Sequence, residues 1–238
     1  MAARIDPKGR VALISGAGRG IGRAVAEKLH QEGYALSLGL RDPGQLADWA
    51  KGRENVLLHN YEARDRAIAG KWVDATVARF GRLDAIVANA GIVERFPFDQ
   101  PDEDALDAMW DVNLKAPYRL IVAALPHLRR SGAGRIVTVV SLAGLRFGGG
   151  SPGYAMAKHA TLALTQIARQ FAWKDGVRAT AICPGSTNTE FIAANRPGAP
   201  ETLTQPEDLA EIVARVIALP NSASVAYVPV NYTAEAKY

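Results

Sequence analysis

Residues Val11–Gly22, VALISGAGRGIG, join a short apolar run to a cluster of glycines. The run predicts a buried β-strand, and the residues from Gly20 to Glu32 predict the helix that follows it. Glycines let the backbone turn tightly and come close to a pyrophosphate, while a helix N-terminus offers amides with a partial positive charge. The glycines at 16, 20 and 22 form G-x-x-x-G-x-G, which differs from the commoner G-x-G-x-x-G. Strand, glycine turn and helix in this order predict a dinucleotide-binding site.

The same alternation of strand and helix continues along the whole chain. Several of the strand-like runs are nearly continuous in Val, Ile, Leu and Ala, which is typical of strands buried on both faces. The alternation predicts an α/β fold with one doubly wound parallel sheet and helices on both faces. No composition shift, long linker or repeat divides the chain, so residues 1–238 are predicted to form a single domain. The predicted strands are Val11–Ser15, Ala35–Leu40, Val56–His59, Ala85–Asn89, Arg135–Ser141, Arg178–Cys183 and Val225–Val230, and the predicted helices are Gly20–Glu32, Arg64–Phe80, Glu103–Leu128, Pro152–Trp173 and Pro206–Leu219.

The composition narrows the class of protein further. Hydrophobic residues make up 48% of the 238 residues, which is enough to bury a full core. Charged residues make up 22%, which argues against disorder. The net charge of +4 is spread without basic runs, which argues against a nucleic-acid partner. Cys183 is the single cysteine, so no intramolecular disulfide can form, and the four histidines are too dispersed for a metal cluster. No apolar stretch approaches the roughly 18 residues of a membrane span, and the N-terminus lacks a signal-peptide core, so we expect a cytoplasmic protein without a membrane partner.

The end of the second predicted strand, Leu38-Gly39-Leu40-Arg41-Asp42, bears on the choice between NAD and NADP. An acid at this point binds the adenosine-ribose 2′-hydroxyl of NAD, whereas an arginine suits the 2′-phosphate of NADP. Leu40 accepts no hydrogen bond, Arg41 follows it, and Arg19 lies in the glycine turn. The two arginines favour NADP(H) over NAD(H). The alternative is that Arg41 is a solvated loop residue and Asp42 binds the ribose.

Tyr154 and Lys158 lie four residues apart in a predicted helix, 13 positions after Ser141. Four residues is about one helical turn, so the phenol and the ammonium are expected on one face within reach of each other. A phenol has an ordinary pKa of about 10, and a nearby cation lowers it by favouring phenolate. Such a tyrosine can exchange a proton with an alcohol or carbonyl oxygen. By itself, the same spacing is also typical of a solvated helix face.

Four further motifs follow these residues in a fixed order. They are Asn89-Ala90-Gly91 after the fourth strand, Asn113 in the next helix, Ser141 after the fifth strand and Pro184-Gly185 after the sixth. With the glycine turn and the Tyr154–Lys158 pair, they resemble the short-chain dehydrogenase/reductase family over essentially the whole chain. Within that family the chain resembles the 3-oxoacyl-carrier-protein-reductase-like branch. The resemblance implies a Rossmann-type sheet of about seven strands in the order 3-2-1-4-5-6-7 and a homodimer or homotetramer.

The resemblance also implies a division of chemical roles. Tyr154 is similar to the family's general acid/base, and Lys158 to the residue that binds the nicotinamide ribose and lowers the pKa of the tyrosine. Ser141 is similar to the residue that hydrogen-bonds the substrate oxygen, and Asn113 to one that holds a water linking Lys158 to solvent. The cofactor-binding residues that the glycine turn, the second strand and the resemblance indicate are Gly16, Arg19, Gly20, Ile21, Gly22, Arg41, Asn60, Tyr61, Asn89, Ala90, Gly91, Tyr154, Lys158, Pro184, Gly185 and Thr189.

These residues together predict an enzyme, an NADP(H)-dependent oxidoreductase that interconverts a small-molecule ketone or aldehyde and an alcohol. Because cells keep NADPH reduced, we expect carbonyl reduction. One alternative is an NAD(H)-preferring dehydrogenase of the same family. Another is a non-catalytic dinucleotide-binding regulator, against which the complete Ser-Tyr-Lys-Asn set argues. A dehalogenase on the same fold would lack the glycine turn and would carry Arg in place of Lys158.

The chain departs from the family pattern at three places. Ser15 replaces the usual Thr but keeps the hydroxyl, and Ala88 replaces the first Asn of Asn-Asn-Ala-Gly, which removes a loop-bracing side chain. The C-terminus lacks the usual Asp-Gly-Gly, which puts a tetramer contact in doubt.

The loops after the fourth and fifth strands are expected to border the substrate. An arginine there, Arg95 or Arg146, either binds a carboxylate or lies on the rim. The segment 190–205 is expected to form a lid.

Overall fold

The computed structural model describes residues 4–148, 150–195 and 202–234. Its centre is a parallel sheet of seven strands in the order β3-β2-β1-β4-β5-β6-β7, as the resemblance implied. The strands are β1 (Val11–Ser15), β2 (Ala35–Leu40), β3 (Val56–Asn60), β4 (Ala85–Ala88), β5 (Arg135–Val139), β6 (Arg178–Pro184) and β7 (Tyr227–Val230).

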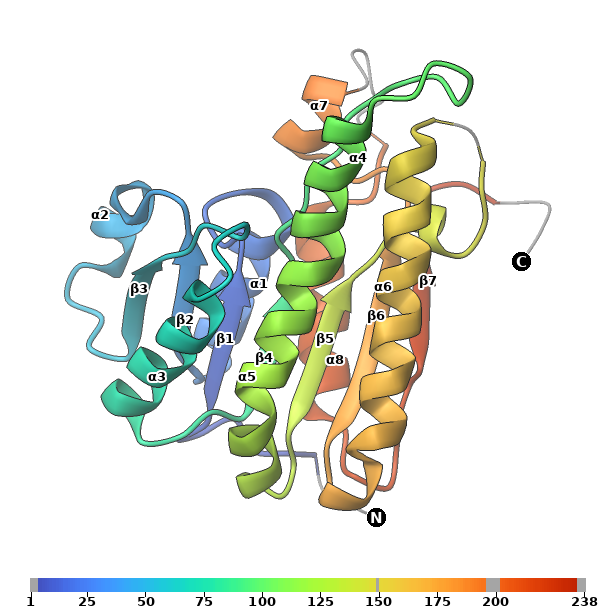
Figure 1. Cartoon of the computed structure of the whole chain (residues 1–238). Coiled ribbons are helices and arrows are strands. Elements are labelled where there is room, and N and C mark those ends of the chain that lie inside the picture. Colours follow the sequence, from blue (N-terminus) through green and yellow to red (C-terminus); the bar gives the residue numbers. More distant parts are fainter. Residues whose placement is uncertain (1–3, 149, 196–201, 235–238) are drawn as a thin grey trace.

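Helices cover both faces of the sheet, as Figure 1 shows. The helices α1 (Gly20–Gln31) and α8 (Pro206–Ala218) pack on one face, and α3 (Ile68–Phe80), α5 (Ala116–Arg130) and α6 (Pro152–Phe171) pack on the other. The residues of β1, β4, β5 and β6 are buried throughout, because helices lie on both sides of them. The predicted α/β architecture is therefore confirmed.

The sheet order places the carboxyl ends of β1 and β4 next to each other at its centre. Strand order reverses at this point, since β2 and β3 lie on one side of β1 and β4 to β7 on the other. In open α/β sheets, ligands bind in the crevice outside such a reversal. The loops after β1, β4, β5 and β6 therefore converge on one edge of the sheet.

The long helix predicted over Glu103–Leu128 is three elements in the structure. These are α4 (Glu103–Trp110), a wider π-helical turn η2 (Asp111–Lys115) and α5. Pro117 contributes to the interruption because it has no N–H to donate to the Asn113 carbonyl four residues earlier. That carbonyl accepts a hydrogen bond of 2.7 Å from the Thr161 hydroxyl of α6.

Short elements that the apolar pattern did not predict complete the fold. They are η1 (Pro43–Leu46), α2 (Ala47–Ala50), η3 (Leu142–Gly144), η4 (Trp173–Asp175) and α7 (Glu190–Asn195). The segment 190–205, predicted to form a lid, begins with helix α7, and its residues 196–201 lie outside the described residues. Each of these helices has six residues or fewer, which is too short for a 3.6-residue apolar period to be visible.

Candidate active site

The glycine turn between β1 and α1 is held against the loop after β4. Gly16 and Gly20 have φ angles of +68° and +54°, which favour glycine. The Asn89 side-chain amide donates to the backbone carbonyls of Ser15 (3.0 Å) and Gly16 (3.1 Å). In return, the Ser15 hydroxyl accepts from the backbone N–H groups of Asn89 (3.0 Å) and Ala90 (3.1 Å). Asn89 thus braces the turn although Ala88 replaces the first asparagine of the family pattern.

Gly22 has a packing role beneath this turn. A Cβ atom at this position would lie 2.2 Å from the Gly16 carbonyl oxygen and 2.5 Å from Asn89 Nδ2. Any side chain would therefore push the turn away from α1. Gly22 does not line the cleft described below, so it supports the cofactor-binding surface without forming part of it.

At the end of β2, Arg41 lines the cleft described below, whereas Asp42 caps a neighbouring helical turn. Asp42 Oδ1 accepts a hydrogen bond of 2.9 Å from the Gly44 N–H and so caps the η1 turn. Asp42 does not line the cleft, whereas Arg41 and Arg19 do. Asn60 does not line it either, because its side chain donates to the Arg41 carbonyl at 2.6 Å. Asn60 thus fixes the backbone of Arg41.

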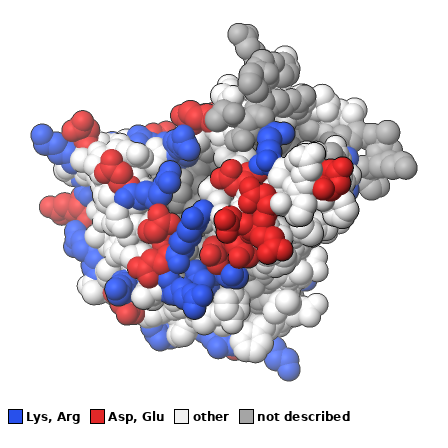
Figure 2. Space-filling model, turned by 45° about the horizontal axis from the view of Figure 1, so that its top comes forward, with Lys and Arg blue, Asp and Glu red and all other residues white. Residues whose placement is uncertain are grey.

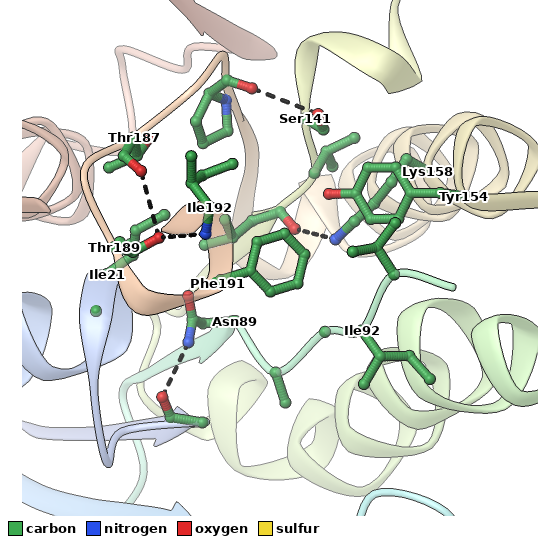
Figure 3. A pocket seen from close by; sticks show the side chains of 18 of the residues that line it. Ile21, Asn89, Ile92, Ser141, Tyr154, Lys158, Thr187, Thr189, Phe191 and Ile192 are labelled. Atoms are coloured by element: carbon green, nitrogen blue, oxygen red, sulfur yellow. Dashed lines mark hydrogen bonds between the residues drawn. The ribbon is translucent and has the colours of Figure 1, made fainter. Parts of the chain in front are cut away.

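Tyr154 and Lys158 lie on the first turns of α6, whose N-cap residue is Ser151. The Ser151 hydroxyl accepts from the Tyr154 N–H (3.3 Å) and donates to the Glu94 carbonyl (2.6 Å), and Pro152 occupies the first helical turn. The Lys158 ammonium lies 5.6 Å from the centre of the Tyr154 ring. The two side chains therefore share one face of the helix, as their spacing predicted, and Figure 3 shows them together with Ser141.

Ser141 lies at the end of β5, where its side chain caps the η3 turn. Its hydroxyl accepts from the Ala143 N–H (3.1 Å) and makes a long 3.4 Å hydrogen bond to the Pro184 carbonyl. Gly144 lets this turn pack on α6, because a Cβ there would lie 2.8 Å from the Lys158 carbonyl oxygen. The turn and the helix therefore hold Ser141 and Tyr154 in one fixed arrangement.

Burial dominates the titration of the Tyr154–Lys158 pair. Burial raises the pKa of the Tyr154 phenol to about 12, and the Ser141 hydroxyl opposes this rise only in part. Burial also lowers the pKa of the Lys158 ammonium to about 8, against a smaller opposing effect of Cys183. The predicted lowering of the tyrosine pKa by Lys158 does not appear here. The reason is geometric, since the ammonium donates to the Val139 carbonyl at 2.8 Å instead of to the phenol.

Asn113 lies in the π-helical turn η2 and is almost completely buried. Its Oδ1 accepts from the Ile92 N–H and its Nδ2 donates to the Ile92 carbonyl, both at 2.9 Å. A Cβ on Gly91 would lie 3.0 Å from this Oδ1 and 3.6 Å from Lys158 Nζ. The Asn113 side chain does not line the cleft, and it braces the loop that does. A π-helical turn is a frequent feature of functional sites.

One cleft of about 1100 Å³ joins these parts at the carboxyl edge of the sheet. Of the residues predicted to carry out the reaction or to bind the cofactor, only Gly22, Asn60 and Asn113 do not line it. Those that line it are Gly16, Arg19, Gly20, Ile21, Arg41, Tyr61, Asn89, Ala90, Gly91, Ser141, Tyr154, Lys158, Pro184, Gly185 and Thr189.

Several residues of the cleft wall were not predicted. Asn231, Tyr232 and Thr233 line the cleft because β7 pairs with β6 in the register Pro184↔Val230. Asn231 lies so close to the loop after β6 that a Cβ on Gly185 would be 2.7 Å from its Oδ1. The only signal in the sequence is their position directly after the last strand of a parallel sheet.

Comparison with known proteins identifies the family. Residues 10–199 match the family described as short chain dehydrogenase. The chain is 39% identical over 222 residues to an agropine synthesis reductase of Rhizobium rhizogenes, with 92% of this chain and 51% of that protein covered. The chain thus spans about half the length of this curated relative. Because residues 10–199 make up most of the chain, their match shows that the chain belongs to the short-chain dehydrogenase/reductase family of NAD(P)-binding oxidoreductases.

Two solved structures of oxidoreductases share the fold over nearly the full chain. An alcohol dehydrogenase from the archaeon Thermococcus sibiricus, solved with 5-hydroxy-NADP, is 30% identical with a TM-score of 0.86, covering 96% of this chain and 99% of that one. A levodione reductase is 28% identical with a TM-score of 0.85, covering 94% and 97%. Within the described residues, no helix is long and apolar enough to cross a membrane, and no group of three or more His, Cys, Asp or Glu could hold a metal ion.

Proposed function

We propose that this chain, as a single domain, is an NADP(H)-dependent oxidoreductase that interconverts a ketone or aldehyde and an alcohol by hydride transfer. One observation carries the proposal. Ser141, Tyr154 and Lys158 line the same cleft as the glycine turn at the N-terminus of α1. Proton-transferring groups and a dinucleotide-binding surface are thus continuous, as hydride transfer to a carbonyl carbon requires.

The residues present fit a bound nicotinamide dinucleotide. Gly16 and Gly20 line the cleft without side chains, so the backbone of the turn is open to a phosphate. A Cβ at Gly16 would lie 3.0 Å from the Ala90 Cα and one at Gly20 3.1 Å from Thr189 Cγ2, so side chains there would crowd the loops after β4 and β6. The N-terminus of α1, whose first amides have no partner within the helix, begins at this turn. Arg19 and Arg41 would hold the adenosine end, while Pro184, Gly185 and Thr189 would hold the nicotinamide end.

The preference for NADP(H) over NAD(H) rests on the end of β2. Arg41 lines the cleft, and Asp42, the acid that could bind a ribose 2′-hydroxyl, caps η1 and does not line it. Arg41→Ala is expected to raise the dissociation constant for NADPH about tenfold or more while changing that for NADH little. Lys51→Ala, which removes an exposed cation that does not line the cleft, is the matched control. Equal effects of Arg41→Ala on both cofactors would contradict the assignment of Arg41 to the 2′-phosphate of NADP(H).

The chemistry divides between the cofactor and the chain. Bound NADPH would supply the hydride to the carbonyl carbon. Tyr154 would donate its phenolic proton to the carbonyl oxygen, and the Ser141 hydroxyl, which now donates only a long 3.4 Å bond to the Pro184 carbonyl, would donate to the same oxygen instead. Lys158 would bind the nicotinamide ribose, and Asn113 keeps the intervening loop in place through Ile92.

At neutral pH, the protonation states of Tyr154 and Lys158 suit carbonyl reduction. A Tyr154 pKa of about 12 keeps the phenol protonated at neutral pH, which is the form that donates a proton to a carbonyl oxygen. A Lys158 pKa of about 8 keeps most of this side chain cationic below pH 8. A non-catalytic dinucleotide-binding regulator would need neither group, so the convergence of Ser141, Tyr154 and Lys158 favours an enzyme.

The finer assignments belong to the same proposal. Membership of the 3-oxoacyl-carrier-protein-reductase-like branch and a cytoplasmic location rest on the sequence resemblance and composition. A homodimer or homotetramer is supported by large apolar side chains exposed on the outer faces of α5 and α6, namely Tyr118, Val122, Ile167 and Phe171. A panel of ketones, aldehydes and alcohols, followed at the nicotinamide absorbance with both cofactors, tests the proposed reaction. Absence of turnover with every carbonyl, despite tight NADPH binding, would favour the regulator.

A further inference from the structure

Charged side chains are distributed unevenly along the cleft. Eight described residues that line it carry a formal charge, and only Glu62 and Glu190 are acidic. Glu62 follows β3, and Glu190 Oε2 lies 4.0 Å from the Cβ position of Gly20. Both acids therefore belong to the end of the cleft near the glycine turn and β3. The basic residues that line it are Arg19, Arg41, Arg64, Arg95, Arg146 and Lys158.

The other end of the cleft, beside Ser141 and Tyr154, is lined by two arginines. Arg95 follows β4, and Arg146 follows β5 and η3. Among the described residues of these two loops, no acidic side chain lines the cleft. The acids of α4, Glu103, Asp104 and Asp107, are exposed and do not line the cleft. Figure 2 shows one large group of acidic side chains on this face of the molecule with basic side chains beside it, and further acidic side chains scattered over the face.

The structure fixes the backbone of Arg146 relative to Ser141. Three consecutive backbone hydrogen bonds close the turn, from Gly144 to Ser141 (2.9 Å), from Leu145 to Leu142 (2.9 Å) and from Arg146 to Leu142 (3.1 Å). The side chain then lies along the loop, because Arg146 Nη1 is 3.7 Å from the Cβ position of Gly148, which also lines the cleft. A cation so close in the chain to the substrate-binding serine bears on which substrates bind.

We propose that the cleft selects carbonyl substrates that carry a carboxylate, bound by the Arg146 guanidinium with Arg95 at the rim, while Ser141 and Tyr154 hold the reacting oxygen. This inference rests on the proposed function and specifies its substrate class. A guanidinium binds a carboxylate through two parallel hydrogen bonds, which orients the substrate as well as attracting it. Arg146 is thus a residue that determines specificity.

The test compares oxo acids with their neutral methyl esters. The substrates are 2-oxobutanoate, 3-oxobutanoate and 4-oxopentanoate with their methyl esters, at saturating NADPH. The wild type is expected to show kcat/KM about tenfold or more higher for at least one acid than for its ester. Arg146→Gln is expected to lose about 10- to 100-fold for that acid and little for the ester, so the ratio approaches one. Arg146→Lys keeps the charge and should retain part of the preference.

Controls separate the possible failures. Arg66→Gln removes a charge from an exposed arginine that does not line the cleft and should leave the ratio unchanged. An unchanged NADPH dissociation constant in Arg146→Gln shows that the variant is folded. If esters are reduced as well as acids, or if Arg146→Gln keeps the wild-type ratio, the carboxylate inference is wrong while the proposed reaction stands.

A binding measurement covers the case in which no probe is reduced. Calorimetric titration of the NADP⁺-loaded wild type and of Arg146→Gln with the three oxo acids then decides the inference. If the wild type binds an oxo acid and Arg146→Gln does not, the result supports carboxylate selection and shows that the proposed reaction is wrong. Absence of binding by the wild type would overturn the inference.

Discussion

The buried ammonium of Lys158 is expected to destabilise the folded protein at neutral pH. Lys158 is 4% exposed, and burial lowers its pKa from 10.5 to about 8. At about 1.4 kcal/mol for each pKa unit, the difference corresponds to roughly 3 kcal/mol. Because the folded-state pKa is the lower one, the unfolded chain binds more protons between pH 8 and pH 10.5, so this cost is present below pH 8 and disappears as the pH rises through that window.

Replacing Lys158 by methionine allows the destabilisation by the buried ammonium to be measured. Lys158→Met removes the charge but also the 2.8 Å hydrogen bond to the Val139 carbonyl, whose loss costs roughly 1–3 kcal/mol. The sign of the net change at pH 7 therefore depends on two opposing terms. The pH dependence does not, because only the wild type carries the titrating group. We expect the variant's stability relative to the wild type to fall by roughly 2–3 kcal/mol between pH 7 and pH 10.

Urea unfolding of both proteins at pH 7, 8, 9 and 10 measures this change directly. Lys51→Met serves as the control, because Lys51 is exposed and its replacement should leave the difference from the wild type independent of pH. A difference for Lys158→Met that stays constant over the same range would refute the assignment of a low pKa to Lys158.

Three further substitutions test how the cleft is built. Gly22→Ala places a Cβ 2.2 Å from the Gly16 carbonyl, and we expect a loss of about 1–3 kcal/mol in urea unfolding together with weaker NADPH binding by titration; normal binding would show that the turn tolerates the shift. Asn89→Ala removes two hydrogen bonds to the turn, at about 1 kcal/mol each, and should weaken NADPH binding as well, whereas a change in stability alone would argue against a role in the cofactor site. Ser37→Ala deprives the buried Trp72 Nε1 of its acceptor and should cost about 1–3 kcal/mol with kcat unchanged, since Ser37 lies away from the cleft; a lower kcat would contradict that separation.

The strands and the residues at their carboxyl ends could be predicted from the sequence because their signals are local. The apolar runs of β1 and β2 have the predicted bounds, Val11–Ser15 and Ala35–Leu40. A parallel sheet then brings the ends of its central strands to one edge, whatever the details of packing. That the glycine turn, Ser141 and Tyr154 lie close together could therefore be predicted without knowledge of the tertiary contacts.

Features that depend on contacts between distant segments could not be predicted. The interruption at η2 involves Pro117 and the hydrogen bond from Thr161. The apolar pattern continues across these residues, so by itself it predicts one unbroken helix. The place of Asn231 in the cleft wall depends on how β7 pairs with β6. The pKa of Tyr154 depends on burial, which reverses the direction expected from its spacing to Lys158. Such properties follow from three-dimensional packing, whose partners a linear pattern does not identify.

The central claim is that Tyr154 transfers the proton that accompanies hydride transfer in this cleft. Stopped-flow measurement of NADPH oxidation by a carbonyl substrate, in the wild type and in Tyr154→Phe, tests it most directly. The expected result is a hydride-transfer rate at least about 100-fold lower in Tyr154→Phe, with an NADPH dissociation constant within about twofold of the wild type. A wild-type rate in Tyr154→Phe would contradict the account.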